Sequence, residues 1–60
     1  MLTPETMLSD CQARFHLLTH WDKEFVNFVD ERLTSNLTLT PDQINALKRV
    51  WSYAVNESRP

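Results

Sequence analysis

The residues of this sequence that could bind a metal ion are one cysteine and two histidines, Cys11, His16 and His20. Thiolate and imidazole are ligands that zinc prefers, and two histidines four residues apart can share one face of a helix. On the same helix, however, Cys11 would point to the opposite side, and a structural zinc site needs four ligands. The sequence therefore predicts no metal site and no cofactor, but a buried thiol and two solvated histidines.

Catalysis by acid–base or hydrolytic chemistry needs ionisable groups that converge in a pocket. The eight Asp and Glu side chains fall on the predicted outer faces of helices, and no Ser–His or Cys–His pairing is indicated. The chain also has no glycine, which argues against phosphate-binding loops because these use backbone conformations that glycine adopts at low cost. We therefore expect a protein that is not an enzyme.

Length and charge narrow the kinds of partner. The 60 residues are expected to form one domain, residues 1–60, and a chain this short buries only about 60% of its unfolded surface. Small domains often gain stability from a partner chain. One cysteine cannot form an internal disulfide, which favours the cytoplasm. A net charge of −2 argues against nucleic acid as a partner, and no apolar run is long enough to cross a membrane.

Three helices are predicted to position these residues, over residues 4–18, 20–34 and 41–56. The first and the last begin with the same pair of residues, Thr3-Pro4 and Thr40-Pro41. In each pair threonine caps the helix and proline suits its first position. Gln43 lies three residues after Thr40, where its side chain can complete a capping box.

The sequence leaves open whether the first two helices are continuous, because neither proline nor glycine interrupts residues 15–33. One long helix with a return helix would need to dimerise. Against this alternative, a continuous helix would place Asp22 in the middle of its apolar face. If Thr19 caps a new helix instead, Asp22 takes the third position, where a carboxylate can complete a capping box. We therefore predict a break at residues 18–20.

The second predicted helix is expected to be the centre of the core. Its apolar side chains form one broad face on a helical wheel: Trp21, Phe25, Val26, Phe28, Val29 and Leu33. The first helix offers a narrower face: Met7, Leu8, Cys11, Phe15 and Leu18. The last helix carries a stripe: Ile44, Leu47, Trp51, Ala54 and Val55. Amphipathic helices of this kind bury their apolar faces against one another, so the predicted fold is an all-α three-helix bundle.

The apolar stripe of the last helix is wider than one neighbouring helix would cover, because Ala46, Val50 and Tyr53 extend it. We predict that these three side chains contact a protein partner, with Lys48 and Arg49 as rim charges. The partner is either another protein or a second copy of the chain in a homodimer. The alternative is that the three side chains cover the first helix inside the bundle.

A polar face on the same helix suggests a different function. Asn45, Lys48 and Arg49 could lie along the phosphates of a nucleic acid. The face carries only two positive charges, and Asp42 and Glu57 oppose them. A small nucleic-acid-associated accessory protein is therefore the alternative to a protein-interaction module.

Two stretches resemble a known class of proteins: Trp21-x3-Phe25-Val26 and Leu39-Thr40-x2-Gln43-x3-Leu47-x2-Val50. They are similar to short helical segments of phage and prophage accessory proteins. The resemblance implies a gene on a mobile element and a non-catalytic inhibitor or modulator of a host protein machine. Such proteins act by covering a surface of their target in the host cytoplasm, as anti-CRISPR proteins do. No functional residue is transferred by the resemblance.

Overall fold

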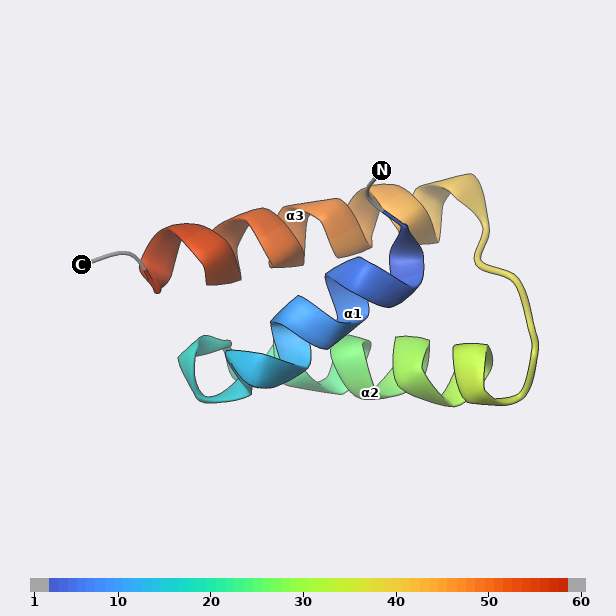
Figure 1. Cartoon of the computed structure of the whole chain (residues 1–60), viewed down its shortest axis with the longest axis horizontal. Helices are drawn as coiled ribbons and strands as arrows, with labels where there is room; N and C mark the ends of the chain where they lie inside the picture. The colour runs from blue at the N-terminus through green and yellow to red at the C-terminus, as the bar shows by residue number, and fades with distance from the viewer. Residues whose placement is uncertain (1–2, 59–60) are drawn as a thin grey trace.

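The computed structural model describes residues 3–58, which form three α-helices and one short 3-10 helix. The elements are α1 (Pro4–Ala13), η1 (Phe15–Leu17), α2 (His20–Thr34) and α3 (Pro41–Glu57). α2 and α3 run in opposite directions along the long axis of the molecule, and α1 crosses obliquely between them (Figure 1). No strand is formed within residues 3–58, so the predicted all-α fold of three helices is confirmed.

The first helix is shorter than the predicted range of residues 4–18. It ends at Ala13, and Arg14 leaves the helical conformation at φ −116° and ψ 23°. The N–H of Arg14 donates instead to the carbonyl of Cys11 over 3.2 Å. After the 3-10 turn, Leu18 is extended at ψ 151°. The predicted break at residues 18–20 is confirmed, and the alternative of one long helix is wrong.

Threonine caps begin all three α-helices, as predicted. In each cap the threonine Oγ1 accepts a hydrogen bond at 3.2 Å from the N–H three residues on: Thr6 for Thr3, Asp22 for Thr19 and Gln43 for Thr40. At the last cap, the N–H of Thr40 also donates to Oε1 of Gln43 over 2.9 Å, which completes the capping box. These bonds satisfy N–H groups that a helix start otherwise leaves unpaired.

α2 ends in a turn that uses a left-handed residue, Asn36, at φ 61°. The N–H of Leu37 donates to the carbonyl of Arg32 over 2.9 Å, and the N–H of Asn36 donates to that of Leu33 over 3.2 Å. This pair of bonds is the Schellman motif. Glycine usually takes the left-handed position, but the chain has none, and asparagine tolerates that conformation better than most residues.

The core is built mainly from α1 and α3. Its buried apolar side chains are Met7, Leu8, Cys11, Leu18, Val26, Val29, Leu47, Val50 and Ala54. α1 packs closely against α3 and also against α2, whereas α2 contributes only Val26 and Val29 to the buried set. The helix at the centre is therefore α1, and the expectation that residues 21–33 form the centre of the core is wrong.

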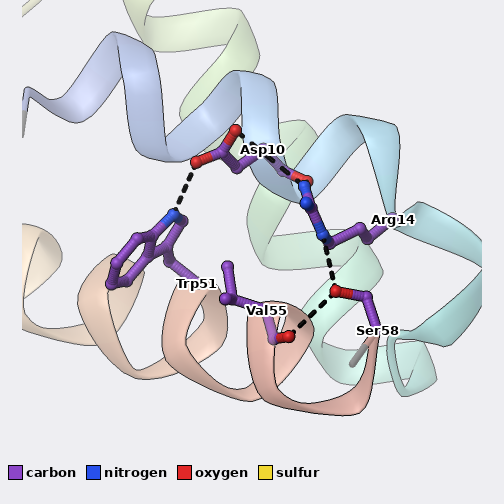
Figure 2. Close-up of polar contacts among 5 residues, drawn as sticks. All are labelled: Asp10, Arg14, Trp51, Val55 and Ser58. Atoms are coloured by element: carbon purple, nitrogen blue, oxygen red, sulfur yellow. Dashed lines mark hydrogen bonds and ion pairs between the residues drawn. The ribbon is translucent and has the colours of Figure 1, made fainter. Parts of the chain in front are cut away.

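Polar contacts also join α1 to the second half of α3 (Figure 2). The indole Nε1–H of Trp51 donates to Oδ2 of Asp10 over 2.8 Å. Nη1 of Arg14 donates to the carbonyl of Asp10 over 3.1 Å, and its Nε donates to Oγ of Ser58 over 3.0 Å. The Ser58 hydroxyl in turn donates to the carbonyl of Val55 over 2.8 Å. These bonds hold the end of α1 against α3.

Candidate protein interface on α2

The α3 residues that the sequence predicts as a partner surface do not form one exposed apolar face. Val50 is only 7% exposed and belongs to the core, so its predicted role in contacting a partner is corrected. Leu47 and Ala54, three residues before and four residues after Val50, are also buried. Val50 therefore lies on the side of α3 that faces the core. Ala46 is half-buried, Tyr53 is 41% exposed, and Lys48 and Arg49 are exposed. Of Ala46, Val50 and Tyr53, only Tyr53 is therefore exposed.

The polar face of α3, which the sequence suggests as a nucleic-acid surface, is exposed to solvent. Asn45, Lys48 and Arg49 are all exposed, and their spacing of three and four residues places them on one side of the helix. Two cations are a weak basis for binding a phosphate backbone, because affinity depends on how many phosphates are neutralised. The chain also carries a net negative charge.

The cysteine and the two histidines differ in solvent exposure. The side chain of Cys11 is fully buried, whereas His16 and His20 are exposed. Burial, and next the neighbouring Asp10 carboxylate, raise the pKa of the Cys11 thiol from 9.0 to about 11. Over residues 3–58, no three His, Cys, Asp or Glu side chains come together as metal ligands. The thiol is therefore protonated at neutral pH and is not a nucleophile there.

One cavity of ≈ 380 Å³ opens between the start of α1, the end of α2 and the start of α3. It is lined by Pro4, Glu5, Leu33, Asn36, Leu37, Thr38, Leu39 and Ile44. Among the lining residues that the structure describes, Glu5 alone has an ionisable side chain. Acid–base catalysis usually pairs two groups with different pKa values, and this lining provides one.

Two of the four large apolar side chains that are exposed within residues 3–58 lie instead on α2. Trp21 is 77% exposed and Phe28 is 39% exposed, and Phe25 between them is half-buried. Their spacing of four and three residues places them in one line along the helix. Val26 and Val29 face the core about a quarter of a turn away and are 0% exposed. We call Trp21, Phe25 and Phe28 the aromatic stripe.

Neighbouring side chains hold the aromatic stripe in place. The ring centroids of Phe25 and Phe28 are 6.2 Å apart, at an interplanar angle of 30°. The guanidinium of Arg32 lies 5.6 Å from the centroid of Phe28, and its Nη2 donates to the carbonyl of Thr38 over 2.9 Å. Side chains that are ordered before binding lose less conformational entropy when a partner arrives. The two phenylalanine rings are therefore pre-organised.

The sequence prediction missed this surface because it treated all apolar residues of α2 as one buried face. Two stripes are present on the helix: the aromatic stripe, and an aliphatic stripe formed by Val26, Val29 and Leu33. Together they are wider than one neighbouring helix can cover. The same width argument that pointed to α3 could have pointed to α2. The width of the apolar face does not, however, show whether the aromatic or the aliphatic stripe is buried.

Comparisons with protein-family models, with curated proteins and with solved structures give no match for this chain. The resemblance to phage and prophage proteins therefore depends only on the residues that carry it, and remains a prediction. Within residues 3–58, no helix has both the length and the apolar character that crossing a membrane requires.

Proposed function

We propose that this protein is a small, non-catalytic interaction module that binds another protein through the aromatic stripe of α2. The observation that carries the proposal is the 77% exposure of Trp21. Tryptophan is enriched among the few residues that supply most of the energy of protein interfaces. Trp21 has the highest exposed fraction of the large apolar side chains within residues 3–58, and Phe28 on the same stripe is exposed as well.

The spacing of the stripe supports one particular mode of binding. Helices that bind in a groove of a partner place their anchors at positions i, i+3 or i+4, and i+7. Trp21, Phe25 and Phe28 have this spacing. Of the residues between the anchors, Glu24 and Asn27 are exposed and polar. α2 can therefore present Trp21 and Phe28 to a groove, with the exposed part of Phe25 between them. Phe25 also packs against the core, and the valines stay buried.

The effect on the partner that we propose is occlusion of a surface. Acting on a host machine as a phage-encoded inhibitor is one form of such an effect. Among the described residues, Glu5 alone is ionisable around this cavity, and the thiol of Cys11 is buried and protonated. Both observations support a role that involves no chemistry. Tyr53, Lys48 and Arg49 of α3 are a second exposed surface, and the same experiment tests them.

The test is capture of partners on the immobilised full-length chain from a lysate of the source organism, with and without nuclease. Trp21→Ala should remove the captured protein, and nuclease should leave it in place. Leu37→Ala is the matched control, because Leu37 is an exposed apolar residue outside the stripe. Capture that survives Trp21→Ala but is lost with Tyr53→Ala would assign binding to α3 and contradict the proposal. Loss of capture after nuclease treatment would favour the nucleic-acid alternative through Asn45, Lys48 and Arg49.

A further inference from the structure

Acidic side chains border the aromatic stripe along its length. Glu24 and Glu31 are both exposed, and helical geometry places them on the side of the stripe that faces away from Val26 and Val29. They are seven residues apart, so they lie about two turns from one another on the same edge. Asn27 lies between them and is also exposed. A surface that covers the stripe must therefore also approach two carboxylates.

The cations of α2 leave this acidic edge largely uncompensated. Arg32 is engaged by Phe28 and by the carbonyl of Thr38, and the ammonium of Lys23 lies 5.5 Å from the ring of Phe15. Within residues 3–58, the ion-pair neighbour of Glu24 is His20, at 3.4 Å, and the Glu24 side chain is still 60% exposed. The edge is thus available to basic groups of a partner.

A second copy of the chain fits this edge poorly. In a two-fold symmetric dimer with antiparallel α2 helices, each edge of the stripe meets the same edge of the other copy. Glu24 would then lie near Glu31 of the second copy, and the reverse contact would repeat this repulsion. Like charges at such positions are destabilising. Charge therefore disfavours an antiparallel homodimer through the stripe, whereas a different protein can bring basic groups to the same edge.

We propose that the partner is a different protein with an apolar groove that receives Trp21, Phe25 and Phe28 and with Lys or Arg side chains along one rim. This inference rests on the proposed function of the stripe and adds the chemistry of what binds there. The groove supplies the affinity by burying the aromatic anchors. The basic rim meets Glu24 and Glu31, which sets the orientation of α2 and makes association sensitive to salt.

The experiment measures the protein retained on the immobilised full-length chain from nuclease-treated lysate, over a series of NaCl concentrations. The test variant is Glu24→Gln/Glu31→Gln. The matched control is Glu5→Gln/Glu57→Gln, which removes the same charge from exposed positions on other helices. Two rim ion pairs correspond to about a 2- to 30-fold change in affinity. We expect the test variant to weaken capture in that range at low salt, and the control to behave as the wild type.

The outcomes separate this inference from the proposed function. If Trp21→Ala removes capture, about 30-fold or more, and the test variant also weakens it, both stand. If Trp21→Ala removes capture but the test variant and salt do not change it, the basic rim is wrong and the proposed function stands. If Trp21→Ala has no effect, both fail. If the retained protein is the chain itself, with a dimer mass in sedimentation equilibrium, the inference of a different partner is overturned. Circular dichroism of each variant checks that the fold is intact.

Discussion

The indole Nε1 of Trp51 lies 2.8 Å from Oδ2 of Asp10, and this hydrogen bond joins positions 41 residues apart in the sequence. The other carboxylate oxygen of Asp10 lies 3.9 Å from Nη1 of Arg14. The ion pair is long and its side chains are 31% and 39% exposed, so it contributes little by itself. The indole bond is shorter and has a charged acceptor, and such bonds are stronger than neutral ones. Trp51 therefore aligns α3 on α1, whereas Trp21 faces solvent.

We predict that Asp10 and Trp51 are energetically coupled. In a double-mutant cycle with Asp10→Ala and Trp51→Phe, the coupling energy should be about 1–2 kcal/mol, because the bond has a charged acceptor and is partly buried. Denaturant unfolding of the wild type, both single variants and the double variant measures this coupling. Strict additivity of the two single effects would show that the bond does not stabilise the fold.

We predict that the two stripes of α2 differ sharply in their effect on stability. Trp21→Ala should change the free energy of unfolding by less than about 0.5 kcal/mol, as expected for an exposed residue. Val26→Ala removes two buried carbon atoms and should destabilise by about 2 kcal/mol. Thermal or denaturant unfolding measures both. A large loss of stability with Trp21→Ala would mean that the stripe belongs to the core, and the proposed interface would be lost with it.

Thr40→Ala should destabilise the protein by about 1 kcal/mol, because it removes the acceptor for the N–H of Gln43. Thr40→Ser is the control and should keep most of the stability, since serine has the same acceptor. A thermal melt compares the three proteins. Equal melting temperatures for Thr40→Ala and wild type would show that this cap does not stabilise α3.

Asn36 is expected to tolerate glycine and to reject alanine. Its φ of 61° costs a residue with an ordinary Cβ about 1–2 kcal/mol, so Asn36→Ala should destabilise by about 1 kcal/mol. Asn36→Gly should leave stability unchanged or raise it slightly, because glycine takes this conformation freely. Denaturant unfolding distinguishes the two variants. The turn would be wrongly described if Asn36→Ala were as stable as Asn36→Gly.

We predict that ionisation of Cys11 destabilises the folded protein in alkaline solution. Its pKa is raised from 9.0 to about 11, so the unfolded chain releases the thiol proton at a lower pH than the folded chain does. The contribution of the buried, protonated thiol is therefore complete below pH 9 and is lost as the pH rises toward 11. Between about pH 8 and pH 11 the wild type should lose about 2–3 kcal/mol more than Cys11→Ala.

Guanidinium unfolding curves of the two proteins across this pH range measure the difference directly. Subtracting the Cys11→Ala curve removes every pH-dependent contribution that both proteins share. Parallel pH profiles for wild type and Cys11→Ala would show that the thiol titrates alike in the folded and the unfolded chain.

What the sequence determined by itself is where each helix begins. Thr3, Thr19 and Thr40 each cap their helix through a hydrogen bond that closes within three residues, so the information lies in a few adjacent positions. The apolar face of α1 was also predictable, because Met7, Leu8 and Cys11 are its buried residues and no competing apolar stripe lies on that helix. The end of α1 was not, since nothing in residues 14–18 interrupts a helical pattern.

Only the tertiary structure decided which side of α2 is buried and which helix is central. α2 carries two apolar stripes, and the side chains alone do not rank them: the larger aromatic residues would be expected inside. After the turn through η1 and Leu18, α2 packs on α1 with Val26 and Val29 buried and Trp21 in solvent. The same packing buries Val50 and brings Trp51 to Asp10. Such contacts depend on where distant segments lie, and helical periodicity reports only on a residue's own turn of helix.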